Sequence, residues 1–375
     1  MASYQNLPLY SVNIKAFVKL GLIESNNSTR RFLLGIIIIV TYIGQLTNMF
    51  RTWDVDIGET GMNFHVLALV THYLLRFIII VRKEKKFERL FQGIEPWYTD
   101  IERHGDPHIV SILQKITQKT QRLTRLSFYA SVVATLATFI YSLSFEERRL
   151  LVTVQYPFFD VLQTPFFEFF FLIQMVWLVP TSLLVYLSFT NIFLTSLMFG
   201  ELILKDLCLK LRNIRSENEM TMLKEFKDCI AYHNKIIDLC DDIEDLISMD
   251  AFFHVTSFGM MLCMLLFFLS MIDDLELIPA VLVMMGFDMY LIGFSYYYAN
   301  NLATESLEVA NAAYDTPWYR GNLEMRKCVL IMIARSQNPL QITAGGLYPL
   351  TMENFQAILR ISYSYFSLLQ GVSQQ

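Results

Sequence analysis

Residues 343–372 read TAGGLYPLTMENFQAILRISYSYFSLLQGV and form the last apolar stretch of the chain. A helix needs about 20 mostly apolar residues to cross a bilayer, so this stretch is predicted to be a transmembrane helix. Its polar residues recur every three or four positions and therefore lie along one side of the helix: Glu353, Gln356, Arg360, Ser364, Ser367 and Gly371. Because polar groups are costly in lipid, this polar stripe is expected to face protein or water.

Two interpretations of the polar stripe stay open from the pattern alone. In the first, the stripe packs inside a bundle of helices. In the second, the stripe borders a pore. One helix cannot enclose a pore, so the second interpretation also requires several subunits to assemble.

The composition indicates a membrane protein. The chain has 375 residues, of which 54% are hydrophobic and 17% are charged, whereas soluble domains have about 25% charged residues. The net charge of −5 gives no indication of a nucleic-acid partner. The long apolar runs therefore favour one polytopic membrane protein over two or three soluble domains.

Seven apolar segments are predicted to cross the membrane, and the predicted fold class is an all-α membrane protein. They lie at about residues 32–50, 62–81, 126–145, 165–200, 251–272, 277–302 and 343–372. The fourth is longer than one crossing and contains Pro180, so it is expected to protrude, tilt or kink. Arg76, Glu168 and Asp288 are charged residues inside these segments, and we expect them to pair within the protein.

The distribution of basic residues predicts the orientation. A cytoplasmic N-terminus places 25 of the 30 lysines and arginines in cytoplasmic segments and only Arg51, Arg148 and Arg149 outside. This asymmetry follows the positive-inside rule. The predicted topology has a cytoplasmic N-terminus and an extracellular C-terminus, which is opposite to that of receptors coupled to G proteins.

The chain divides into four parts on this basis. They are a cytoplasmic N-terminal segment (1–31), six transmembrane helices (32–302) with cytoplasmic helical extensions at about 82–125 and 201–250, a cytoplasmic anchor (303–340) with a short helix at 323–336, and the last transmembrane helix (341–375). Apolar residues recur at helical spacing in the extensions. We expect these faces to assemble within the chain and between subunits; the alternative is that each helix lies on the membrane surface.

No pattern in the sequence indicates catalysis. The six histidines are scattered, and His104 and His108 have Gly105 and Pro107 between them and no cysteine nearby. No glycine-rich phosphate loop is present, and the pair Gly345-Gly346 before the last span is predicted to be a hinge or turn. We therefore expect no catalytic residues, no metal site, no cofactor and no enzymatic activity.

The C-terminal region resembles a known family. The stretches ESLEVANAAYDTPWY (305–319) and MIARSQNPLQITAGGLYPLTMENFQAILRISYSYFSLL (332–369) are similar to the C-terminal signature of insect odorant receptors. The short loop between the fourth and fifth spans and the Ser-Tyr-Ser-Tyr-Phe sequence near the end resemble the ligand-tuning subunits of that family. They do not resemble its universal co-receptor.

The resemblance implies a channel. Such subunits assemble with the co-receptor into tetrameric, ligand-gated, non-selective cation channels in the plasma membrane of olfactory neuron dendrites. The cytoplasmic helices form a central anchor, and the last helix of each subunit lines a conduction path. Aligning Tyr365 and Phe366 with the family's pore helix places Leu368 at a hydrophobic gate and Val372 one turn beyond, while the polar stripe favours Ser364, Ser367 and Gly371.

The resemblance also implies an odorant pocket in the outer half of the membrane, among spans two, three, four and six. The residues at that depth are Leu69, His72, Tyr73, Ala134, Ala137, Thr138, Tyr141, Phe170, Phe171, Gln174, Met175, Val281, Leu282 and Met285. This mostly aromatic and aliphatic set suits a small, volatile, weakly polar ligand, with an aromatic ring as one option. Ordinary helix packing is the alternative for each of these residues. A gustatory-type channel subunit is the main alternative function, followed by a seven-helix receptor that signals through G proteins.

Overall fold

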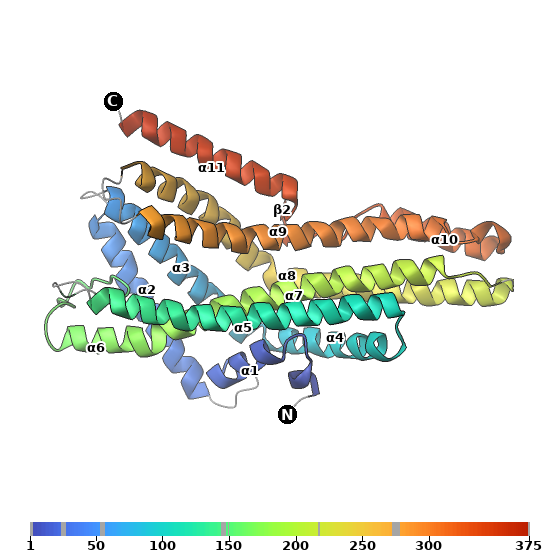
Figure 1. Ribbon diagram of the computed structural model, residues 1–375, viewed down its shortest axis with the longest axis horizontal. Helices are drawn as coiled ribbons and strands as arrows, with labels where there is room; N and C mark the ends of the chain where they lie inside the picture. Colours follow the sequence, from blue (N-terminus) through green and yellow to red (C-terminus); the bar gives the residue numbers. More distant parts are fainter. Residues whose placement is uncertain are drawn as a thin grey trace.

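The computed structural model describes residues 3–23, 28–52, 57–143, 148, 150–216, 218–271 and 278–373. These residues form helices and one small hairpin of two strands (Figure 1). The elements in chain order are η1 (Ser3–Asn6), α1 (Ser11–Leu20), α2 (Ser28–Thr52), α3 (Ile57–Arg82), α4 (Glu84–His104), α5 (Pro107–Leu143), α6 (Phe166–Ile173), η2 (Gln174–Leu178), α7 (Val179–Arg212), α8 (Glu219–Met271), α9 (Ile278–Tyr314), η3 (Trp318–Arg320), α10 (Leu323–Ser336), β1 (Thr343–Ala344), β2 (Tyr348–Pro349) and α11 (Met352–Ser373).

Several helices are much longer than a bilayer crossing. The 53 residues of α8 span about 80 Å at 1.5 Å per residue, against about 30 Å of hydrocarbon. Helices α7, α8 and α9 run side by side beyond α2, α3 and α11 to the right-hand end of Figure 1, where α10 lies. The molecule is therefore an elongated bundle. We call the part that contains α2, α3 and α11 the apolar section, and the part in which α7, α8 and α9 continue past it to α10 the extension.

The segment 82–125 is divided between two helices. Helix α4 ends at His104, and α5 begins at Pro107 and runs through the predicted third span without a break. Proline is well placed in the first turn of a helix, because the amide hydrogen it lacks would have no partner there, whereas it ends the helix that precedes it.

The fourth predicted span is helical from Phe166 to Arg212, with a π-helical section over Gln174–Leu178. Pro180 lies directly after that section, in the first turn of α7. Proline cannot donate a backbone hydrogen bond, and local π-helix is one of the ways in which a helix accommodates the lost bond.

The last helix starts later than predicted. Residues 343–372 were assigned to the last span, but α11 begins at Met352, and the hairpin β1–β2 precedes it. The turn predicted at Gly345-Gly346 is confirmed. The hairpin turns at Gly345 and Gly346, whose φ angles are +65° and +72°. Glycine adopts this left-handed conformation without the steric cost that other residues meet, so these two positions end the helical pattern.

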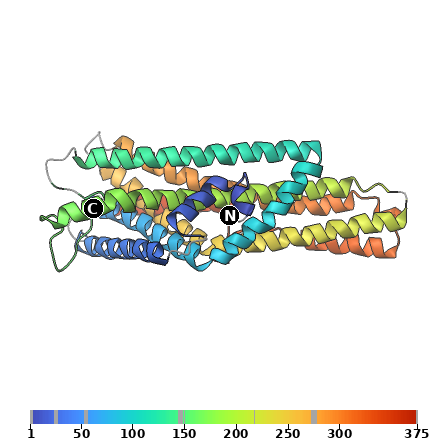
Figure 2. The same ribbon diagram turned by 90° about the horizontal axis from the view of Figure 1, so that it is seen from below.

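Helix α7 occupies the centre of the bundle. Every residue from 185 to 200 is buried, and α5, α8 and α9 pack along it. Figure 2, which views the bundle from below, shows α5 along one edge and α2 along the other. The core therefore follows α7 from the apolar section into the extension.

Four described helical segments are long and apolar enough to cross a membrane. They are Thr29–Thr52, Asn63–Arg82, Phe166–Arg212 and Glu219–Ser270. The crossings predicted for α5, α9 and α11, and the orientation of the chain, stay predictions.

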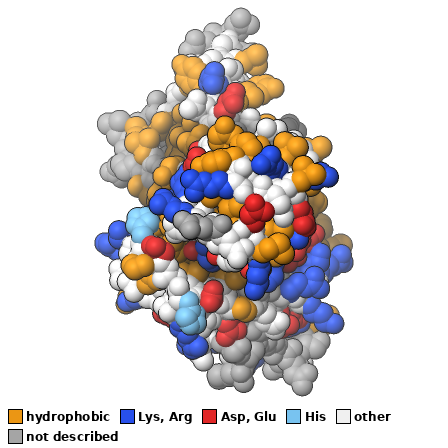
Figure 3. All heavy atoms as spheres, turned by 90° about the vertical axis from the view of Figure 1, so that its right-hand side faces the viewer, with side chains coloured by type: hydrophobic (Ala, Val, Ile, Leu, Met, Phe, Trp, Pro, Cys, Tyr) orange, Lys and Arg blue, Asp and Glu red, His pale blue; other side chains and the backbone are white. Residues whose placement is uncertain are grey.

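The far end of the extension carries exposed apolar side chains. Leu323, Leu330 and Ile331 of α10 are each 68% exposed. Figure 3 looks onto this end and shows hydrophobic, basic and acidic side chains interspersed.

Candidate functional site

Helix α11 turns its polar stripe away from the rest of the chain. All six stripe residues are exposed. Ile361, Tyr365 and Leu368 beside them are 54%, 61% and 62% exposed. The stripe therefore does not pack against other described helices of this chain.

The opposite side of α11 holds the helix to α8 and α9. Ile358 is 8% exposed and Ser362 is 2% exposed. The Ser362 hydroxyl donates a hydrogen bond to the carbonyl of Gly259 in α8 at 3.1 Å. The ring of Phe355 lies 5.4 Å from that of Tyr296 in α9. Helix α11 thus has one side fixed to its own chain and one side free for another chain, water or lipid.

The hairpin before α11 is attached to α8. The backbone N–H of Gly345 donates to the Ser248 carbonyl at 2.9 Å, and that of Gly346 donates to the Ser248 hydroxyl at 3.1 Å. Thr343 is hydrogen-bonded to Glu244 one turn earlier. A displacement of α8 at these positions therefore moves the start of α11.

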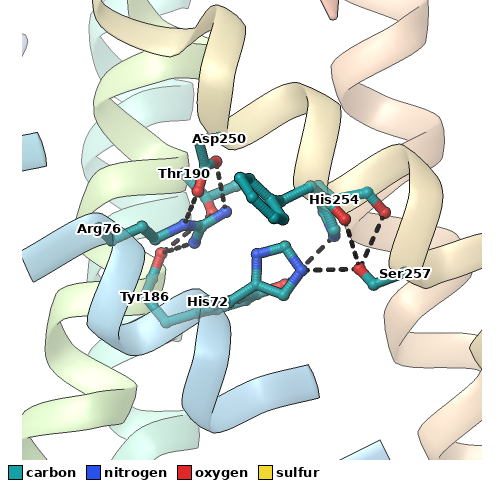
Figure 4. Close-up of polar contacts among 8 residues, drawn as sticks. His72, Arg76, Tyr186, Thr190, Asp250, His254 and Ser257 are labelled. Carbon is teal, nitrogen blue, oxygen red and sulfur yellow. Dashed lines mark hydrogen bonds and ion pairs between the residues drawn. The ribbon is translucent and has the colours of Figure 1, made fainter. Parts of the chain in front are cut away.

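A buried ion pair lies two residues further along α8 (Figure 4). The Arg76 guanidinium of α3 donates to both carboxylate oxygens of Asp250, at 2.8 and 3.0 Å. It also donates to the Tyr186 carbonyl at 2.8 Å and the Thr190 hydroxyl at 3.0 Å, both in α7. Arg76 is 2% exposed and Asp250 is 4% exposed. A buried ion pair is tolerated when its geometry is good and its remaining hydrogen-bonding groups are satisfied, as they are here.

Two histidines adjoin this ion pair, as Figure 4 shows. His72 Nε2 and the Ser257 hydroxyl are 2.8 Å apart and share a hydrogen bond. The rings of His72 and His254 are 5.2 Å apart, edge to face. The Tyr186 hydroxyl lies 3.4 Å from His254 Nε2. Polar contacts therefore connect α3, α7 and α8 at one level, which we call the polar junction (His72, Arg76, Tyr186, Thr190, Asp250, His254, Ser257).

A cavity of about 20 Å³ lies at the polar junction, where α3, α7, α8 and α9 meet. Its lining includes Arg76, Asp250, His254 and Tyr296, together with Leu350 from the segment before α11. This volume accommodates about one water molecule. None of the predicted ligand residues lines it, and it is too small for the ligand class expected.

Three of the predicted ligand residues are engaged within the chain. The His72 side chain contacts Ser257, as described above, and the Tyr73 hydroxyl shares a hydrogen bond of 2.8 Å with the Thr181 hydroxyl. The Gln174 side chain bonds both the N–H and the carbonyl of Val152, each at 2.9 Å. Gln174 therefore fixes the connection between α5 and α6 to the helix that follows it.

The other described ligand residues lie on several surfaces. Phe170 and Phe171 form ring contacts with Tyr156 and Phe139. Met175 and Met285 are half-buried, whereas Leu69, Ala137 and Leu282 are exposed. The side chains of Ala134, Thr138, Tyr141, Val281 and Val372 lie outside the described part, although their backbones belong to α5, α9 and α11. The ligand site stays a prediction.

Sequence reasoning assigned no role to Asp250, Ser257 or Thr181. The signal for Asp250 was Arg76, because an arginine within an apolar run needs a partner. Arg76, Glu168 and Asp288 were expected to pair internally. Arg76 pairs with Asp250, and Glu168 lies 3.7 Å from Arg148. Asp288 lies 3.9 Å from His65 without a hydrogen bond between them, so its pairing stays a prediction. Periodicity does not reveal which of the chain's 35 acidic residues is the partner.

Known proteins resemble this chain over its whole length. A family described as 7tm Odorant receptor matches residues 56–363. Odorant receptor Or2 of Anopheles gambiae is 30% identical over 382 residues, covering 98% of this chain and 99% of that protein. Odorant receptor 10 of Aedes albopictus is 29% identical over 377 residues, covering 99% and 100%. Among solved structures, the insect olfactory receptor OR5 from Machilis hrabei has a TM-score of 0.79 at 15% identity, covering 99% of this chain and 100% of that chain.

The fold and the apolar helices define the chain as an all-α, multi-pass membrane protein. Because the family match covers most of its length, the chain belongs to the insect odorant receptor family. This is a family of odorant-gated channels and not of enzymes. Both relatives carry the name odorant receptor and neither is named as a co-receptor. The match argues against the gustatory-type and G-protein-coupled alternatives.

Proposed function

We propose that this chain is the odorant-binding subunit of a heteromeric, ligand-gated, non-selective cation channel. It assembles with the family's co-receptor into a tetramer in the plasma membrane of olfactory neuron dendrites, with its N-terminus in the cytoplasm and its C-terminus outside. One observation carries the proposal. The polar stripe of α11 is exposed, while the other side of that helix is fixed to α8 and α9.

In this proposal α11 borders the conduction path. Ser364, Gly371 and the rest of the stripe face water, and Leu368 and Val372 close the path as apolar rings that exclude water. The Ser364 hydroxyl donates to the Arg360 carbonyl at 2.9 Å, so it presents an acceptor to the path without leaving a donor unsatisfied. Widening the Leu368 ring by a small shift of α11 admits hydrated cations.

The subunits assemble through the extension. Leu323, Leu330 and Ile331 at its far end are exposed in the single chain. Leu323 and Leu330 are seven residues apart and therefore lie on one face of α10, with Ile331 beside them, and an exposed apolar face of this kind fits an interface. In the tetramer, the far ends of the extensions of the four chains meet around one axis. They bury these side chains there and form the cytoplasmic anchor.

The odorant binds among α3, α5, α6–α7 and α9, at the fourteen residues assigned from the resemblance. Support for a small, weakly polar ligand comes from the Machilis hrabei receptor, which was also solved in complex with eugenol. Binding opens the channel only to the extent that the open state holds the odorant more tightly. The polar junction and the hairpin on α8 connect this region to α11.

Whole-cell current on odorant application tests the proposal. Cells express this chain alone, the co-receptor alone, or both, with a G-protein blocker present throughout. A fast cation current that requires both chains is the expected result. Current from this chain alone contradicts the heteromeric subunit, and a response that disappears under the blocker contradicts the channel.

A further inference from the structure

A second cavity lies between α5, α7 and α9, away from the polar junction. Its volume is about 170 Å³, many times the roughly 10–15 Å³ that one water requires. Its lining contains Lys115 and Lys119 of α5, Glu201 and Lys205 of α7, and Tyr298 of α9, with apolar residues at its base. Lys115 and Lys119 are exposed, so the cavity opens on the protein surface.

Not all of this charge is balanced within the chain. Lys205 lies 2.6 Å from Glu201 and 3.5 Å from Glu305, so these three groups carry one net negative charge between them. Lys119 donates a hydrogen bond to the Tyr298 hydroxyl, which leaves the Tyr298 proton free to be donated into the cavity. Lys115 has no ion pair or hydrogen bond within the described part of the chain. Together with Lys115 and Lys119, the charged groups at the opening therefore carry one net positive charge, and both exposed lysines lie on the α5 side.

The sequence of α5 adds to the positive charge beside the cavity. Its 37 residues contain no aspartate or glutamate. Lys115, Lys119 and Arg122 recur at helical spacing and lie on one face. An apolar, exposed section begins directly after them, at Leu126. Basic clusters immediately beside a transmembrane segment are typical of sites for anionic lipid head groups.

The distance of the two lysines from Leu126, where the apolar part of α5 begins, distinguishes between phosphate-bearing ligands. Lys119 and Lys115 precede Leu126 by seven and eleven residues, which is about 10 and 16 Å of helix. The head-group region of one leaflet is only about 5–8 Å thick. A phosphodiester next to the acyl chains therefore does not reach these lysines, whereas phosphates on a ring that projects from the membrane do.

We propose that this cavity binds the phosphorylated inositol ring of a phosphoinositide in the inner leaflet. Lys115 and Lys119 pair with the ring phosphates, and the Tyr298 hydroxyl donates a hydrogen bond to one of them. This proposal rests on the orientation given under the proposed function, which places the end of α5 that carries Lys115 and Lys119 in the cytoplasm. The bound lipid joins α5 to α7 and α9, two of the helices that continue into the extension.

Direct binding tests this proposal without any current measurement. The probe is fluorescent short-chain phosphatidylinositol 4,5-bisphosphate, added to the purified full chain in detergent, and the readout is fluorescence anisotropy. The Lys115→Gln/Lys119→Gln variant is expected to weaken binding about 30-fold, since each basic residue near a lipid head group contributes about 1 kcal/mol. Raising the salt concentration should weaken wild-type binding as well.

The matched control is Lys85→Gln/Arg89→Gln on α4. It removes two exposed cations at the same four-residue spacing, next to the membrane end of α3, and neither lines the cavity. This variant should bind the probe like the wild type. Equal losses in the two double variants would mean non-specific attraction and would overturn the site. Lys115→Gln alone, which breaks no described contact, should weaken binding about fivefold if the double variant does not fold.

Two competitors distinguish the sources of phosphate. Unlabelled short-chain phosphatidylinositol 4,5-bisphosphate should displace the probe, and soluble inositol 1,4,5-trisphosphate should do so only at higher concentration. Equal displacement by the soluble compound, or displacement by millimolar inorganic phosphate, would overturn a membrane lipid as the ligand. If the purified chain binds the probe but cells that express it give no odorant current, this lipid site stands and the channel proposal fails.

Discussion

Helices α7 and α11 are both apolar, but they are used in opposite ways. In α7 every residue from 185 to 200 is buried, including Ser188, Thr190 and Ser196. Those polar groups are satisfied inside the protein: Ser196, for example, bonds both the Ile192 carbonyl and the Tyr10 hydroxyl. In α11 the polar stripe faces outward and Leu368 is 62% exposed, whereas Ser362 on the opposite side is buried. The polar residues at 185–200 of α7 thus make contacts inside the protein, whereas the polar stripe of α11 is an unfilled surface.

This contrast has a physical origin in the neighbours of each helix. Helix α7 packs against α3, α5, α8 and α9, so over residues 185–200 every face meets protein. Among the described elements, helix α11 packs mainly against α8 and α9, through one side. The substitutions below test whether α7 supports the fold while α11 serves an assembly. They are ordered by the size of the expected change.

Breaking the ion pair of Arg76 and Asp250, which lies beside α7, should lower the stability of the protein most. Asp250→Asn leaves a buried guanidinium without its counter-charge, and breaking a buried pair in this way costs about 3–5 kcal/mol. We expect a large drop in the thermal unfolding midpoint of the purified protein in detergent. The matched control is Asp245→Asn on the same helix, because Asp245 is 44% exposed where it pairs with Lys86 at 2.7 Å. Exposed pairs contribute about 0–1 kcal/mol. Equal midpoints for the two variants would show that Arg76 is solvated.

The central helix is tested by Leu197→Ala. Leu197 is fully buried, and removing a buried leucine side chain costs about 2–5 kcal/mol. The comparison variant is Leu368→Ala in α11, which should change the free energy of unfolding by less than about 0.5 kcal/mol in the isolated chain. Urea or thermal unfolding of both variants in the same detergent provides the measurement. A destabilised Leu368→Ala subunit would place that side chain against its own chain.

The sequence predicted where apolar helices lie along the chain, but it did not predict which helices surround each of them. The short helix was expected at 323–336, and α10 covers these residues. Periodicity also placed the stripe residues on one side of α11. It did not separate the buried α7 from the open α11, because both have long apolar runs with polar residues at intervals. That distinction depends on which helices lie alongside, and on long-range pairs such as Arg76 with Asp250, 174 residues apart. The start of α11 was wrong because local glycine conformation outweighed the apolar pattern there.

The hairpin on α8 should show an intermediate effect. Gly345 and Gly346 both have positive φ, so alanine at either position costs about 1–2 kcal/mol. A Cβ at Gly345 would also lie 3.0 Å from the Phe252 ring, whereas one at Gly346 would meet nothing within 4 Å. We therefore expect Gly345→Ala to lower the unfolding midpoint more than Gly346→Ala. The reverse order would mean that the hairpin does not rest on α8 as described.

The smallest effect on stability should accompany the largest effect on current. Leu368→Ala removes an exposed apolar side chain from α11, and in the proposed pore this widens the ring that excludes water. We expect a standing cation current without odorant in cells that also express the co-receptor, with surface expression and unfolding midpoint unchanged. Leu359→Ala is the matched control, because Leu359 lies on the same helix and packs against the core. It should lower the unfolding midpoint and produce no standing current. If Leu368→Ala also leaves the channel closed, the side of α11 around Leu368 faces lipid, where the hydroxyls of Ser364 and Ser367 are satisfied by the carbonyls of Arg360 and Tyr363 in their own helix.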